Sequence, residues 1–174
     1  IWHQEIEDIL VLKNNKGTED NRVRKLDYSI QISRLFYERF ISGDDISLFS
    51  PHDVPNLYDL FGTEEFDGLY RTYEEDDRIP KKRIPAQELF GQLIKERAET
   101  GRIYIMNIDH CNSHSSFLDK VEMSNLCQEI TLPTKPLQHI DDPNGEIALC
   151  ILSAINVGKV RSDNELEELC DLTV

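Results

Sequence analysis

The spacing of hydrophobic residues alternates between helical and strand patterns along the first part of the chain. Apolar positions within 6–10 form a helical stripe, which we expect to end in the polar segment 14–17. Apolar and polar residues then alternate over 26–32, which is typical of a strand. Ser33 is suited to cap a helix over 35–41, because its hydroxyl can accept a backbone N–H of the first turn.

Further helices are predicted after residue 50. Two short amphipathic segments, 54–61 and 66–73, precede a longer helix expected over 85–100. This helix starts with a proline, which suits a first turn, and Gly101 is suited to end it. We interpret the basic run 81–83, which follows acidic residues, as a solvated turn.

The last third of the chain changes character. Residues 102–109 alternate like a strand, and the uninterrupted apolar run 147–155 predicts a buried strand. The segment 124–132 lies between them, after a polar loop. Residues 162–165 resemble a capping box that opens a final helix. Helices alternating with buried strands argue for an α/β fold class.

Composition limits the possible functions. The 174 residues fit one domain, and 39% hydrophobic and 30% charged residues are ordinary values for a globular protein. The formal net charge of −14 argues against DNA or RNA as a partner, although one bound nucleotide stays compatible with it. No apolar run reaches the roughly 18 residues that a membrane span needs. We found no leader sequence and expect a cytoplasmic protein.

Both termini suggest a piece of a longer polypeptide. The sequence opens with Ile1, without Met, inside an apolar pattern, and it closes at Val174 within a helix-like stretch. We therefore expect further chain on both sides.

Four cysteines, at 111, 127, 150 and 170, form no C-x-x-C pair and are expected to be free thiols. Cys111 lies between His110 and His114, which suggests a metal site, but zinc needs about four ligands and no others are evident nearby. Cys150 within its apolar run fits a core residue, and Cys170 is expected to pack in the final helix.

One short segment combines three reactive groups. If residues 124–130 are extended, Asn125, Cys127 and Glu129 share one face. An amide can orient a substrate hydroxyl, a carboxylate can take a proton, and a thiol can act as nucleophile or hydrogen-atom donor. From spacing alone, the pattern favours a polar strand edge with an incidental cysteine over a catalytic site.

Longer motifs resemble a known family. Residues 124–136, SNLCQEITLPTKP, resemble the finger-loop motif of class I ribonucleotide reductase large subunits, and residues 145–150, GEIALC, resemble the strand that follows it. The resemblance implies part of a ten-stranded α/β barrel with a central finger loop, incomplete in this chain. Helices and a strand would occupy 1–100, the loop and redox strand 101–158, and a helix start 162–174. Supporting stretches occur in the family's order at 2–3, 12–17, 21–24, 27–28, 48–55 and 101–115.

The resemblance also implies roles for individual residues. Cys127 would carry a thiyl radical that removes the 3′ hydrogen of a ribonucleoside diphosphate. Glu129 would act as base on the 3′ hydroxyl, Asn125 would position the ribose hydroxyls, and Cys150 would be one half of a redox disulfide. The radical would come from a metal-containing small subunit, and electrons from thioredoxin or glutaredoxin. No cofactor or metal would be bound directly, and ATP and dNTP effectors would bind parts of the large subunit that this chain lacks.

Two alternatives belong to other classes. One is a non-catalytic structural or interaction module that retains the reductase fold, against which the retention of the four residues argues. The other is a small metal-binding domain built on His110, Cys111 and His114.

Overall fold

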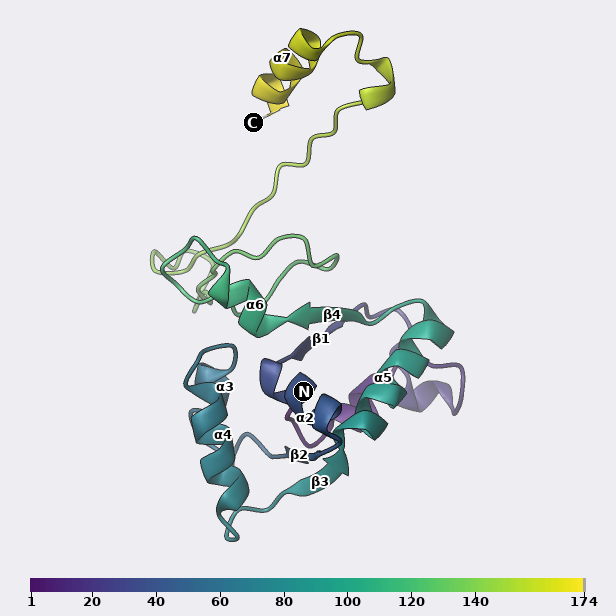
Figure 1. The fold of residues 1–174 in the computed structure, drawn as a ribbon, viewed down its shortest axis with the longest axis vertical. Helices are drawn as coiled ribbons and strands as arrows, with labels where there is room; N and C mark the ends of the chain where they lie inside the picture. Colours follow the sequence, from purple (N-terminus) through teal and green to yellow (C-terminus); the bar gives the residue numbers. More distant parts are fainter. Residues whose placement is uncertain (174) are drawn as a thin grey trace.

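The computed structural model describes residues 1–173, so Val174, the predicted end of the last helix, lies outside the described residues. A packed body holds the buried apolar residues, which extend from Ile1 to Val121. Beyond the body the chain forms loops, and then an extended segment leads to helix α7 (Asp163–Thr173), which stands apart (Figure 1). The fold is mixed α/β, as predicted. The described residues contain no closed barrel.

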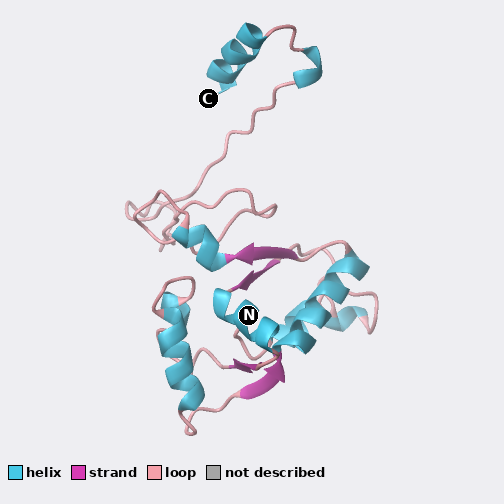
Figure 2. Cartoon of the chain, viewed as in Figure 1, coloured by secondary structure: helices cyan, strands magenta, loops and turns pink. Residues whose placement is uncertain are grey.

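Two small two-stranded sheets lie in the upper and lower parts of the body in the view of Figure 2. Strand β1 (Ser29–Ile32) pairs in parallel with β4 (Tyr104–Asn107). Strand β2 (Asp45–Leu48) pairs in antiparallel orientation with β3 (Lys82–Pro85). Helices connect the strands and supply most of the remaining core.

The first four residues join the two sheets. The backbone nitrogen of Ile1 donates to the carbonyl of Gln31 in β1. On the other side, the N–H of Phe49, just after β2, donates to Trp2 O at 2.8 Å, and Gln4 N donates to Phe49 O at 2.8 Å. The backbone order is therefore β4, β1, residues 1–4, β2, β3. One nearly continuous layer runs through the body.

Local signals position the helices. The Ser33 hydroxyl accepts the Phe36 N–H at 3.4 Å and caps α2. Gly43 and Gly101, with φ of 79° and 65°, end α2 and α5 in the left-handed conformation that glycine tolerates. The α helices are α1 (Ile6–Leu10), α2 (Arg34–Ser42), α3 (Leu57–Leu60), α4 (Phe66–Glu75), α5 (Ala86–Thr100) and α6 (Ile108–Ser113), with 3-10 turns η1 (Glu19–Asn21) and η2 (Val157–Lys159).

A partly buried polar network fastens α4 to β2 and α2. The Tyr70 hydroxyl accepts the Ser47 N–H and donates to Ser47 O, both at 2.7 Å. The guanidinium of Arg39 makes a bidentate ion pair with Glu74, which also accepts from the Ser47 hydroxyl at 2.7 Å. Burial by itself raises the pKa of Glu74, but the hydrogen bonds from Arg39 and Ser47 outweigh it, so the pKa lies below its usual value.

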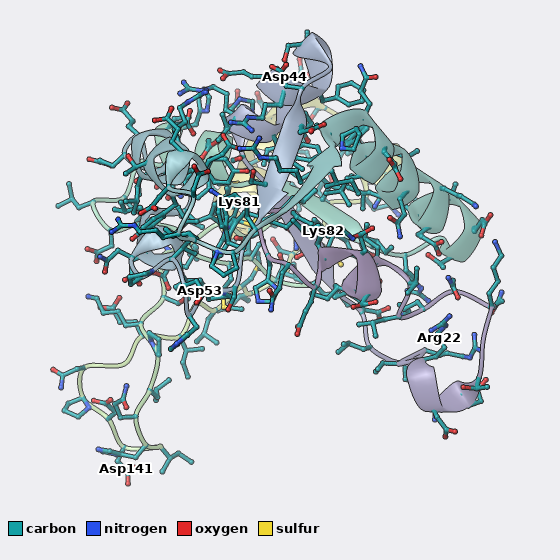
Figure 3. All side chains as sticks on the ribbon, turned by 90° about the horizontal axis from the view of Figure 1, so that it is seen from below. Arg22, Asp44, Asp53, Lys81, Lys82 and Asp141 are labelled. Carbon is teal, nitrogen blue, oxygen red and sulfur yellow. The ribbon has the colours of Figure 1, made fainter. Side chains whose placement is uncertain are left out.

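Several predicted elements are confirmed and others are wrong. The strand expected over 102–109 ends at Asn107, because Asp109 lies in the first turn of α6 and accepts the backbone N–H of Arg34. The solvated turn predicted at 81–83 is wrong, because β3 begins at Lys82. Lys81 instead donates to the C-terminal carbonyls of α4, among them Glu74 O at 2.7 Å. Figure 3 labels both lysines, and Lys82 is exposed at the surface of the body.

The buried strand predicted over 147–155 is also wrong. The structure has no strand there, and Ile151 is 95% exposed. An apolar run becomes a buried strand only when neighbouring strands satisfy its backbone and cover its faces. Residues 1–173 provide none beside this run.

The Glu74 network yields a stability prediction. We expect Glu74→Gln to lower the free energy of unfolding by about 2 kcal/mol at pH 7, because it removes one charge of a partly buried ion pair. A carboxyl whose pKa is lower in the folded state than in the unfolded state stabilises the fold at any pH above its unfolded pKa, 4.5. This stabilisation is lost as the pH falls through the folded pKa. The gap between wild type and variant should therefore shrink below pH 4.5.

Urea unfolding followed by circular dichroism, at pH 7 and at stepwise lower pH, measures this gap. Glu75→Gln is the matched control, since Glu75 is the exposed neighbour on the same helix. A gap that persists unchanged at low pH would contradict the role given to the Glu74 carboxylate.

Candidate functional site

The segment 124–130, here called the Cys127 loop, is attached to the body at its start. The Gln31 side chain in β1 donates to Glu122 O at 2.6 Å. Val121 is fully buried, and its N–H donates to the Asn112 side chain of α6 at 2.7 Å. The loop therefore begins from a fixed point beside β1 and α6.

The loop itself is a closed turn. Gln128 N donates to Asn125 O at 3.2 Å, and Gln128 has a left-handed φ of 70°. The Asn125 side-chain oxygen accepts the Ile130 N–H at 3.0 Å, and the Ser124 hydroxyl donates to Ile130 O. The predicted extended conformation is wrong. These local hydrogen bonds engage part of the loop's backbone, and within residues 1–173 no strand pairs with the segment.

The three predicted site residues therefore do not form a row on one face. Asn125 is half-buried, whereas Cys127 and Glu129 are both exposed. Within residues 1–173 no apolar interior encloses the Cys127 thiol. Cys127 occupies the turn of the loop, where a reactant can reach its sulfur.

A hairpin connects the Cys127 loop to Cys150. Lys135 and Glu146 form an antiparallel backbone pair with N–H···O distances of 3.1 and 3.0 Å. The Lys135 ammonium adds ion pairs to Glu146 at 3.2 Å and Asp119 at 3.5 Å. Three segments thus meet at Lys135. Asp141 lies at the end of the loop that projects from the body (Figure 3).

Beyond the hairpin, Cys150 is exposed, and so is Cys170 on α7. The core position considered for Cys150 and the packing expected for Cys170 are both wrong in the described residues. The run 147–155 forms no strand there, and both thiols are exposed. Neither Cys127 nor Cys150 lines the two cavities beside the loop.

A cavity of about 650 Å³ lies between the Cys127 loop and the body. Asn125 and Ile130 line it from the loop, Gln31 and Phe61 from the body, and Lys135 from the hairpin. A second cavity of about 260 Å³ is lined by residues that include Asn125 and Gln128. Asn125 thus lines both cavities.

The geometry does not support the hypothesis of a metal site at His110, Cys111 and His114. His114 Nδ1 is 3.0 Å from His110 O, within its own helical turn. Among residues 1–173, no three His, Cys, Asp or Glu side chains are grouped to hold a metal ion. Cys111 is half-buried, and burial raises the pKa of its thiol. In the same described range, no helix is long and apolar enough to cross a membrane.

Comparison with known proteins identifies the class. A family model described as the ribonucleotide reductase barrel domain matches residues 1–174, so the chain belongs to this family. The resemblance of the Cys127 loop to that family is thereby confirmed.

The relatives are alpha subunits of ribonucleoside-diphosphate reductase. The subunit of Haemophilus influenzae is 58% identical over 93% of this chain and 22% of its own length. The subunit of Buchnera aphidicola from Schizaphis graminum is 56% identical over 100% of this chain and 24% of its own length. The alpha subunit of reductase 1 from Escherichia coli is 58% identical over 79% of this chain and 19% of its own length. The chain therefore spans less than a quarter of these relatives and corresponds to a segment of the enzyme's alpha subunit.

Sequence reasoning missed three supporting residues. Ser124, Gln31 and Lys135 each hold the Cys127 loop or its hairpin in place. Ser124 was detectable in principle, because serine beside asparagine is typical of local side-chain to backbone bonding. Gln31 and Lys135 act across distant segments and leave no local signal.

Thiol exposure gives a second prediction. We expect iodoacetamide to alkylate Cys127, Cys150 and Cys170 readily, and Cys111 several-fold more slowly. Cys111 is half-buried, and its raised pKa leaves less thiolate at pH 8. Because that pKa lies above its ordinary value of 9.0, the Cys111 rate should keep rising beyond pH 9.

Peptide mapping by mass spectrometry over time measures the four rates separately. Labelling in denaturant is the control, because unfolding removes the burial of Cys111. Equal rates for Cys111 and Cys127 in the folded chain would contradict the structure.

Proposed function

We propose that this chain is the part of a class I ribonucleotide reductase large subunit that carries the radical-bearing thiol, Cys127. The match of all 174 residues to the family, together with 58% identity to alpha subunits, carries the proposal. The complete polypeptide would reduce ribonucleoside diphosphates to 2′-deoxyribonucleoside diphosphates. A reducing cytoplasm suits its free thiols.

In the proposed reaction, a radical delivered from a metal-containing small subunit removes the hydrogen atom of the Cys127 thiol. The thiyl then takes the 3′ hydrogen of the substrate ribose. Glu129 accepts the proton of the 3′ hydroxyl, Asn125 positions the ribose hydroxyls, and the 2′ hydroxyl leaves as water. Cys150 and a second thiol outside this chain supply two electrons and two protons, one proton to the departing water and the other to C2′, and become a disulfide, which thioredoxin or glutaredoxin reduces. Cys127 then returns the hydrogen atom to C3′ and Glu129 returns its proton to the 3′ oxygen, so the thiyl radical is regenerated.

The surface of the chain supports a requirement for additional polypeptide. Ile147, Leu149 and Ile151 are 70%, 81% and 95% exposed, an apolar run that needs a covering layer. A thiyl radical also needs shielding from water and stray reductants, which an exposed turn does not supply. We infer that residues 1–174 are inactive alone and function with the rest of the large subunit, on whose other parts ATP and dNTP effectors would act.

A non-catalytic module with the reductase fold is the second candidate. The exposure of Cys127 and Cys150 in residues 1–173 favours this candidate more than the sequence did. The two candidates differ in whether Cys127 and Glu129 are needed for turnover.

A chimera tests the proposal. Residues 1–174 replace the matching segment of the Haemophilus influenzae alpha subunit, and cytidine diphosphate reduction is assayed with that organism's small subunit and dithiothreitol. We expect turnover by the chimera and none by the 174-residue chain. Cys127→Ser should reduce turnover to background, and Glu129→Gln should lower kcat by about 10²- to 10⁴-fold through loss of the base.

Cys170→Ser is the matched control for thiol removal and should stay active. Circular dichroism and small-subunit binding establish that each variant is folded. A folded chimera without turnover, or one that works equally well with Cys127→Ser, would favour the non-catalytic module.

A further inference from the structure

The Ser124 hydroxyl lies at the closure of the Cys127 loop. Its oxygen donates to Ile130 O and is also 3.1 Å from the side-chain oxygen of Asn125. Ile130 in turn donates its N–H to that same Asn125 oxygen at 3.0 Å. Ser124 and Ile130 are the first and last residues of the loop. They are joined directly by one hydrogen bond and indirectly through the Asn125 side-chain oxygen, which both of them contact.

This closure determines the orientation of the Asn125 amide. A backbone N–H is only a donor, so the Asn125 atom that receives it must be the oxygen. With the oxygen engaged by the loop, the Nδ2 group keeps its two N–H donors for another acceptor. Asn125 also lines two cavities beside the loop.

We propose that Ser124 is a positioning residue, which closes the Cys127 loop and holds the Asn125 amide with its N–H donors available to a ribose hydroxyl oxygen. The proposal rests on the function proposed above for its substrate. Ser124 would touch neither the substrate nor the radical. It acts through Asn125 and through the fixed path of the five residues that follow.

The reason for such a closure is the exposure of the loop. Cys127 and Glu129 are both exposed, so surrounding side chains do not fix the turn in this chain. Internal hydrogen bonds are then the main restraint on its conformation, and a loosely held group loses rate through misalignment even when the fold is intact.

Hydrogen exchange on the 174-residue chain tests the closure without any catalytic assay. In ¹H–¹⁵N spectra we expect Ser124→Ala to speed exchange of the Ile130 amide by about fivefold, the effect of one lost hydrogen bond. Ser124→Thr keeps a hydroxyl and should restore slow exchange. Ser116→Ala, a serine-to-alanine change at an exposed site outside the loop, is the control and should leave Ile130 unchanged.

The chimera tests the consequence for turnover. At a temperature where circular dichroism shows every variant to be folded, Ser124→Ala should lower kcat about tenfold with little change in KM, and Ser124→Thr should recover most of it. A residue that only stabilised the fold would not lower kcat under these conditions.

The two readouts separate the two proposals. Unchanged Ile130 exchange in Ser124→Ala, or an unchanged kcat in an active chimera, would overturn the positioning role. An inactive chimera combined with faster Ile130 exchange would refute the proposed function. It would still support the closure of the loop by Ser124, but without a role in catalysis.

Discussion

The hydrogen bonds of residues 1–4 hold the body of this protein together. Two-stranded sheets are marginal on their own, and a parallel pair such as β1–β4 is rarely found without further strands. Trp2 and Gln4 bond to Phe49 beside β2, while Ile1 bonds to Gln31 in β1. This short segment therefore turns two marginal pairs into one layer, against which the helices bury their apolar faces.

The same layer sets the position of the Cys127 loop. Gln31 accepts the backbone of Ile1 through its carbonyl and donates to Glu122 through its side chain. One residue of β1 thus connects the central layer to the start of the loop. Beyond that point the loop depends on itself, because Ser124, Asn125 and Ile130 replace the partners that a neighbouring strand would supply.

Features of the fold that depend on residues close in sequence were predictable, whereas features that depend on distant segments were not. The cap at Ser33 and the ends at Gly43 and Gly101 rest on residues within one turn, and the predicted helices over 35–41 and 85–100 are confirmed. Strands β2 and β3 were missed because four-residue strands with polar faces are specified by their pairing. The run 147–155 failed for the opposite reason, since its apolar pattern was evident but residues 1–173 contain no partner for it.

The candidate site was also predictable only in part. The identity of Asn125, Cys127 and Glu129 was evident from the sequence, whereas their arrangement depends on what surrounds the loop. Local hydrogen bonds shape the turn, but enclosure of a radical requires layers on both sides of it. Under the proposed function, one polypeptide surface would cover both the exposed run 147–151 and the exposed Cys127 turn. Local closure and outer enclosure would then be separate tasks, the first performed by Ser124 within this chain and the second by the rest of the subunit.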